Sequence, residues 1–127
     1  MQTITAEKPD LKILGGLLAN AFEGANSGWL MIEDYRKPTN LDFLMDGPGA
    51  DAYPHVDYPL NEGGIVYVQD VEAGKTYELT LDSCITGWHL LQEQESRHWM
   101  AALTGNDDAE TADTFLQLCL FGEVLHG

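Results

Sequence analysis

The feature that most constrains this chain is a stretch near its middle through which no regular helix or strand can run. Between Arg36 and Gly63 stand four prolines, with Gly47 and Gly49 among them. Proline removes a backbone donor and glycine loosens the backbone, so this density of both interrupts any periodic pattern. The stretch exceeds the usual length of a connection, which indicates a functional, wrapped or mobile segment. It also holds large apolar side chains: Phe43, Leu44, Tyr53 and Tyr58.

Those apolar side chains favour docking across a core, with disorder as the alternative. A helical turn is expected near Leu41 to Met45, and the rest of the stretch is expected to be irregular. Regular elements should therefore lie on either side of it.

Before the Pro/Gly-rich stretch, the pattern predicts one helix and one strand. Apolar residues at helical spacing indicate a helix from Ala6 or Pro9 to Phe22, and the apolar, aromatic run from Ser27 to Tyr35 suits a strand. After it, strands are predicted at Ile65 to Gln69 and at Thr76 to Leu81. The intervening Asp70 to Lys75 has the composition of a hairpin turn. Together these runs predict a small antiparallel sheet of about three strands.

Three further helices are predicted to cover one face of that sheet. The first should start at a cap on Asp82 or Ser83 and continue to about Glu95, and the second should span Arg97 to Leu103. Asp107 and Glu110 have capping-box spacing at the start of the third, which Gly122 should end. Val124 and Leu125 are expected to pack back on the core. The prediction is a single α+β domain over residues 1–127.

Charge limits the classes of partner that this domain can bind. The chain has 21 Asp and Glu against 6 Lys and Arg, for a net charge of −15, while 44% hydrophobic residues are typical of a packed globular protein. A protein that binds nucleic acids or anionic membranes needs clustered cationic residues, so neither is an expected partner of this chain. No Lys or Arg occurs from Pro38 to Gly74. The excess either gives solubility, as in acid-rich proteomes, or serves a basic partner.

Targeting and redox signals are few. Met1 to Asp10 lack the basic and apolar regions of a signal peptide, and no apolar run approaches the roughly 18 residues of a membrane span. Cys84 and Cys119 each lie in an apolar helical pattern, which favours buried thiols over a disulfide. We therefore expect a cytoplasmic, reduced protein.

Each catalytic template tested on the sequence is incomplete. There is no phosphate-binding loop ending in Gly-Lys-Ser/Thr and no Gly-x-Ser-x-Gly. Glu95 and His98 have the Glu-x-x-His spacing of di-metal helical bundles, but that motif occurs once where such sites need two copies. The four histidines are expected to form ordinary hydrogen bonds. We predict no catalytic residue, no metal and no cofactor, with a small metal-dependent enzyme as the last alternative.

Acidic residues are the best candidates for a binding site. The predicted partner-binding residues are Asp107, Asp108, Glu110 and Asp113 at a helix start, with Glu33 and Asp34 at the end of a strand. Helix capping explains part of the first group, because acids stabilise a helix N-terminus. A chain displaying spaced carboxylates can also occupy a basic groove that normally binds phosphates. This second explanation predicts a nucleic-acid mimic.

The C-terminal part of the sequence resembles a known family. The residues concerned form three blocks: Arg97-His98-Trp99, Gly105-Asn106-Asp107-Asp108-Ala109-Glu110-Thr111-Ala112-Asp113-Thr114-Phe115-Leu116-Gln117, and Leu120-Phe121-Gly122-Glu123-Val124. They are similar to a family of small acidic proteins of uncharacterised activity carried by bacteriophages, prophages and conjugative elements. A looser likeness includes Gly28-Trp29 and Asp34-Tyr35. The resemblance implies no catalytic residue. It implies a mobile-element protein that acts in the cytoplasm of a bacterial host.

These observations lead to one functional hypothesis and two alternatives. The hypothesis is a non-enzymatic protein that binds a basic host or defence protein of the nucleic-acid-binding type, as a nucleic-acid mimic. The first alternative is a structural or assembly role, in which Trp29, Trp99 and Phe121 form a homodimer and the acids only give solubility. The second is the metal-dependent enzyme.

Overall fold

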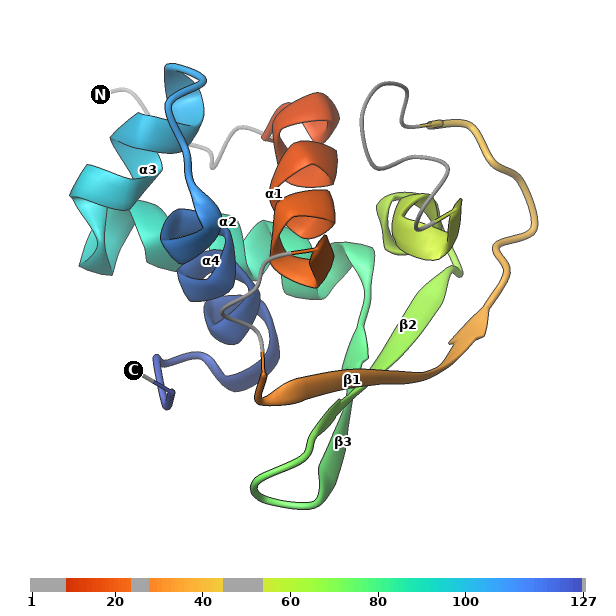
Figure 1. Ribbon diagram of the computed structural model, residues 1–127. Coiled ribbons are helices and arrows are strands. Elements are labelled where there is room, and N and C mark those ends of the chain that lie inside the picture. The colour runs from red at the N-terminus through yellow and green to blue at the C-terminus, as the bar shows by residue number, and fades with distance from the viewer. Residues whose placement is uncertain (1–8, 24–27, 45–53, 127) are drawn as a thin grey trace, which may run out of the picture.

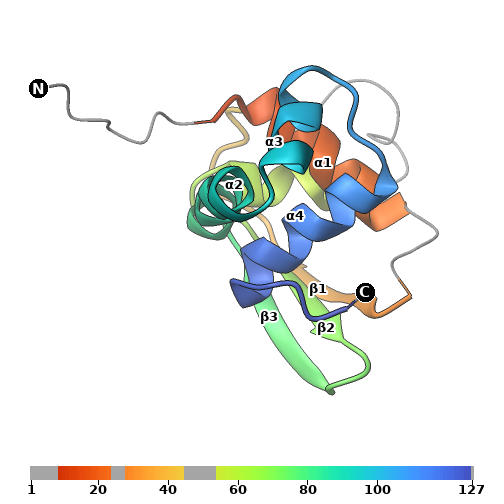
Figure 2. The same cartoon turned by 90° about the vertical axis from the view of Figure 1, so that its left-hand side faces the viewer.

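In the part of the chain that the structure describes, four α-helices pack on one side of a three-stranded sheet. The computed structural model describes residues 9–23, 28–44 and 54–126 (Figure 1). In chain order the elements are α1 (Leu11–Glu23), β1 (Leu30–Arg36), the 3₁₀ helix η1 (Pro54–Leu60), β2 (Ile65–Asp70), β3 (Lys75–Leu79), α2 (Leu81–Gln94), α3 (Ser96–Leu103) and α4 (Ala109–Phe121). Figure 2 places all four α-helices on the same side of the strands. The predicted α+β architecture is confirmed.

The sheet has the order β1-β2-β3, and both pairings are antiparallel. Along β2, buried residues alternate with half-buried ones, so Val66, Val68 and Asp70 point toward the helices. A bulge interrupts the β1–β2 register between Ile32 and Asp34. The helices therefore cover one face, and no described element lies over the other.

The core is formed where α1, α2 and α4 meet. Leu14, Leu18 and Phe115 are fully buried within it. Helices α2 and α4 approach so closely at Gly87 that a Cβ there would overlap the Sγ of Cys119. Both cysteines are buried free thiols, as predicted.

The Pro/Gly-rich stretch docks on the core through residues on both sides of its middle. Residues 41–44 are not helical, so the predicted turn there is wrong, while Met45 and Tyr53 lie outside the described residues. Instead, η1 buries Val56 and Leu60. The Asn61 Oδ1 accepts the Phe43 N–H at 2.7 Å, and its Nδ2 donates to the Phe43 carbonyl at 3.0 Å. One side chain thus joins the two parts by satisfying backbone groups that the irregular chain leaves unpaired.

Two helix starts differ from the prediction by a few residues. Thr80, and not Asp82 or Ser83, caps α2: its Oγ1 accepts the Ser83 N–H at 3.2 Å, and the Ser83 Oγ accepts the Thr80 N–H at 3.3 Å. Leu81 consequently belongs to the helix and not to the strand. Asp108, and not Asp107, caps α4. In both cases the sequence offers neighbouring polar residues of similar capping preference, and the backbone path selects one of them.

Gly122 ends α4 as predicted, in the left-handed conformation at φ 76°. Residues 123–126 then turn back along the helix toward the sheet (Figure 2). Val124 and Leu125 nevertheless remain 43% and 52% exposed, so the expected apolar packing of these two side chains is wrong. The segment is held by polar contacts that are described below.

Candidate functional site

The acids predicted near the start of α4 mostly bond within the chain. Asp108 accepts the Thr111 N–H at 2.9 Å, and this bond together with the Thr111 side chain lowers the pKa of its carboxyl. Asp107 accepts a bond from the Asn20 side chain at 3.1 Å. Glu110 is exposed.

Asp113 is the most strongly engaged of the predicted acids. One of its carboxylate oxygens accepts the Trp29 Nε1–H at 2.7 Å, and the other accepts a bond from the Gln117 amide at 2.7 Å. This carboxylate therefore ties Trp29, the residue that precedes β1, to α4. It is committed to the fold more than to a partner.

Glu33 and Asp34 lie on the face of the sheet that the helices leave uncovered. Asp34 is paired with Tyr67, which in turn is paired with Glu78, and directly opposed residues of antiparallel strands point to the same side. At the bulge, Glu33 reaches across β2 and accepts a hydrogen bond from the Thr76 hydroxyl at 2.9 Å. We call this surface the open sheet face, defined by Met31, Glu33, Asp34, Tyr67, Gln69, Thr76 and Glu78.

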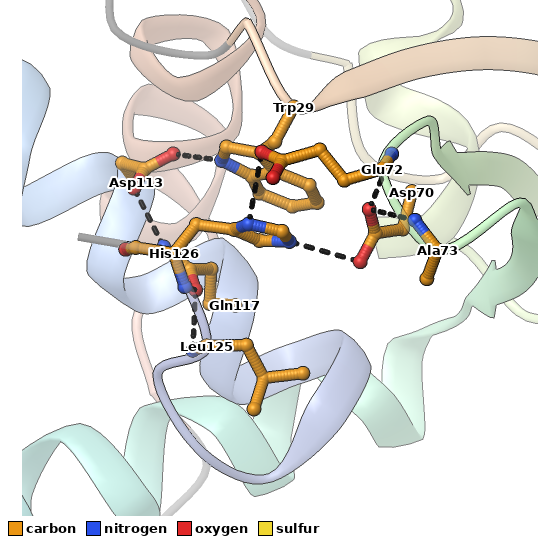
Figure 3. Close-up of polar contacts among 8 residues, drawn as sticks. All are labelled: Trp29, Asp70, Glu72, Ala73, Asp113, Gln117, Leu125 and His126. Carbon is orange, nitrogen blue, oxygen red and sulfur yellow. Dashed lines mark hydrogen bonds and ion pairs between the residues drawn. The ribbon is translucent and has the colours of Figure 1, made fainter.

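A second cluster, on the covered side of the sheet, surrounds His126 (Figure 3). The His126 Nε2 lies 2.9 Å from the Asp70 Oδ2, and its Nδ1 lies 3.3 Å from the Glu72 Oε2. The two carboxylates therefore face opposite sides of one imidazole ring. Only the cationic form of that ring can donate to both.

Asp70 is held in place by the hairpin that follows β2. Its second oxygen, Oδ1, accepts the N–H groups of Glu72 and Ala73 at 3.0 and 3.2 Å. Burial alone would raise the pKa of this carboxyl, but the hydrogen bonds from His126 and from the turn outweigh that cost and lower it. The side chain is only 2% exposed, so the carboxylate depends on these donors.

Aromatic rings complete the surroundings of His126. Its ring stacks on that of Trp29, with the centroids 4.9 Å apart and the planes inclined by 11°. Phe121 meets the imidazole edge-on at 5.9 Å. We call Trp29, Asp70, Glu72 and Phe121, the four residues that surround the ring, the His126 site.

The Gln117 side chain forms hydrogen bonds with backbone groups of Leu125 and His126. It is fully buried; its Oε1 accepts the N–H groups of Leu125 and His126 at 2.8 and 2.7 Å. Its Nε2 donates to the His126 carbonyl at 2.9 Å. These bonds involve only backbone groups of the 123–126 segment, so they would suit other side chains equally well.

This arrangement differs from that of a His–Asp general base. A histidine paired with a buried aspartate has the orientation of a general base, but such a base needs one ring nitrogen free to meet a nucleophile. Here both nitrogens already face carboxylate oxygens. Ser83, in the first turn of α2, is used in the cap of that helix.

The remaining histidines meet the expectation only in part. His98 shares a hydrogen bond with the Thr111 hydroxyl at 2.8 Å. The Nε2 of His89 is buried with no hydrogen-bond partner among the residues that the structure describes. Within the same residues, no group of three or more potential ligands is arranged to hold a metal ion.

Sequence reasoning missed the His126 site because its members are far apart in the chain. His126 and Asp70 are 56 positions apart, and Trp29 precedes Asp70 by a further strand and an irregular stretch. The one local signal was the hairpin turn, where an Asp at the strand end commonly accepts turn amides. The pairing with His126 has no spacing signature.

The aromatic residues named for a possible homodimer also make contacts within the chain. Trp29 is 4% exposed and packs against Phe121 with a centroid separation of 5.4 Å. Trp99 lies 6.0 Å from Trp88. A dimer formed through Trp29 would require the His126 site to open.

Comparison with protein-family models, with curated proteins and with solved structures gave no match for this chain. Over the described ranges, no helix is both long and apolar enough to cross a membrane.

Proposed function

We propose that this chain is a non-enzymatic acidic protein that binds a basic protein surface through its open sheet face. The observation that carries the proposal is the position of the carboxylates there. Carboxylates on both edge strands flank Tyr67 of the central strand: Glu33 and Asp34 on β1, and Glu78 on β3. No described helix covers them.

Charge and geometry support this assignment together. Edge strands of a three-stranded sheet lie two interstrand spacings apart, about 9.5 Å, so cations spread over a partner surface can meet carboxylates on both. The net charge of −15 would speed encounter with a basic partner by electrostatic steering. Half-exposed Met31 adds apolar contact area beside the acids.

We further propose that the partner normally binds nucleic acid, so that the carboxylates replace phosphates. The partner would then be a host or defence protein in the cytoplasm of a bacterium that carries a mobile element. This context rests on the resemblance of the 97–124 region to mobile-element proteins. Glu110 and Asp107 remain candidates for additional contacts, although Asp107 already accepts a bond from Asn20. Asp108 and Asp113 are engaged in the fold.

A charge-matched pair of triple variants tests the open sheet face. In the first, Glu33→Gln, Asp34→Asn and Glu78→Gln remove its acids; in the control, Asp42→Asn, Glu62→Gln and Glu93→Gln remove three exposed acids elsewhere. Proteins captured from a bacterial extract are compared at low and high salt. We expect the first variant to lose salt-sensitive capture and the control to retain it.

Equal loss in both variants would mean that net charge alone matters, and the open sheet face would then be excluded as the binding site. The alternative of a structural homo-oligomer is tested by measuring the oligomeric state of the wild type by sedimentation at the same two salt concentrations. A dimer that is insensitive to salt would support the homo-oligomer instead.

A further inference from the structure

We propose that the His126 site is a binding site for an arginine side chain of the basic partner, and that the 123–126 segment occupies it in the free protein. This inference rests on the proposed function, since it names the chemical group through which that partner is recognised. His126 is then an internal ligand that stands in for the guanidinium.

The surroundings of the imidazole ring suit a planar cation. The Trp29 ring presents its face at 4.9 Å, and the Asp70 and Glu72 carboxylates lie in hydrogen-bond reach of opposite ring nitrogens. A guanidinium is planar, always charged, donates from its edges and stacks on aromatic rings. A lysine side chain carries the same positive charge, but its ammonium group is not planar.

The segment that fills the site is weakly anchored outside it. Val124 and Leu125 are largely exposed, so they contribute little apolar burial. What remains is the His126 ring and the three backbone bonds to Gln117. Because those bonds are independent of side-chain identity, the backbone of a partner segment can form them after the internal segment leaves.

The His126 site also lies next to the surface proposed for the partner. Gln69 of the open sheet face and Asp70 of the His126 site are consecutive residues of β2 that point to opposite sides of the sheet. The hairpin between β2 and β3 begins at Asp70 (Figure 1). A partner bound to the open sheet face would therefore reach the His126 site by extending around this hairpin.

The test uses the full chain and small probes, with no partner protein. His126→Ala removes the internal ligand, and the indole N–H signal of Trp29 is followed by NMR while Nα-acetyl-argininamide is added. We expect a saturable shift in His126→Ala and an affinity at least tenfold weaker in the wild type, where the segment competes. Nα-acetyl-lysinamide, with the same charge, should bind at least several-fold more weakly than the arginine probe.

Two further variants keep the test decisive if His126→Ala folds poorly. Leu125→Pro removes one donor to Gln117 while keeping every residue of the His126 site, and it should raise the affinity for the arginine probe above that of the wild type. Adding Glu72→Gln to either variant should reduce binding. Equal affinities of all these proteins for the probe, or no saturable shift in a folded His126→Ala or Leu125→Pro protein, would overturn the inference.

The outcome is independent of the capture experiment. If the arginine probe fails while the open-face variant still loses its partner, the proposed function stands without this site. If the probe binds as expected while capture is unaffected by the open-face variant, arginine recognition stands and the proposed binding face is wrong.

Discussion

Buried and half-buried polar residues organise much of this molecule. Gln117 and Asp113 together connect α4, Trp29 and the 123–126 segment through hydrogen bonds of 2.7 to 2.9 Å. A buried amide or carboxylate costs stability unless its bonds are made, so such residues specify one arrangement of the chain around them. Asp113 was predicted from the sequence to be a partner-binding residue, and its contacts give it a structural role.

Asp70 provides the pH-dependent prediction at this scale. Its folded pKa lies below the ordinary value of 3.8, so its ionised form stabilises the fold above that pH, and the contribution disappears as the pH falls through the lower folded value. Asp70→Asn should therefore be less stable than the wild type from pH 5 to 7. The difference should shrink once the pH drops below 3.8.

Urea unfolding followed by circular dichroism at several pH values measures this difference. Asp42→Asn, a change at an exposed aspartate, controls for the altered net charge. A stability difference for Asp70→Asn that stays constant down to pH 2 would contradict the assigned role of the carboxylate.

At the scale of elements, two helical glycines have opposite roles. A Cβ at Gly16 in α1 would meet nothing within 4 Å, whereas one at Gly87 in α2 would overlap Cys119 of α4. By helix propensity alone, both glycines weaken their helices. Packing separates them, because the close approach of α2 to α4 requires the absence of a side chain at Gly87.

These glycines give a matched pair of substitutions. Gly16→Ala should stabilise the protein by up to about 1 kcal/mol, since alanine is the better helix former and no contact opposes it. Gly87→Ala should destabilise it by about 1 to 3 kcal/mol through overpacking, despite the same gain in helix propensity. Urea unfolding of both variants against the wild type checks the signs, and two effects of the same sign would argue against the α2–α4 contact.

At the scale of the whole molecule, the buried thiols report on global unfolding. Cys84 of α2 and Cys119 of α4 lie where the two helices meet, and burial together with the hydrogen bond of Cys119 to Cys84 raises the pKa of the Cys119 thiol well above its usual range. The thiolate is the reactive form, so alkylation in the folded state should be slow. The two helices would have to separate before either sulfur met a reagent.

Iodoacetamide labelling at pH 8, quantified by mass spectrometry, tests this protection. We expect negligible labelling in native buffer and complete labelling of both cysteines in urea above the unfolding transition. Cys84→Ala isolates the response of Cys119. Rapid native labelling of that variant, at unchanged stability, would mean that α4 opens without global unfolding.

The predicted elements were recovered because their signals are local. Helical spacing predicted α1 and α4, β-branched and aromatic runs predicted β2 and β3, and Gly122 marked the end of α4. The capping residues were wrong at Thr80 and Asp108, where adjacent polar residues compete. The 3₁₀ helix η1 was missed because its two prolines read as breakers, while the core contacts of Val56 and Leu60 stabilise it.

By itself the sequence determined the α+β class, the acidic character and the position of the irregular stretch, since each follows from composition or from short-range pattern. Only the tertiary structure decided which acids remain available. Folding commits Asp108 to a helix cap and Asp113 to two hydrogen bonds, one of them from the distant Trp29. Glu33 and Asp34 each accept one hydrogen bond, from the Thr76 hydroxyl and the Tyr35 N–H, and lie on an uncovered sheet face. Folding also brings Asp70 to His126 across 56 positions, a contact that depends on how the sheet, α4 and the 123–126 segment pack and that no local pattern encodes.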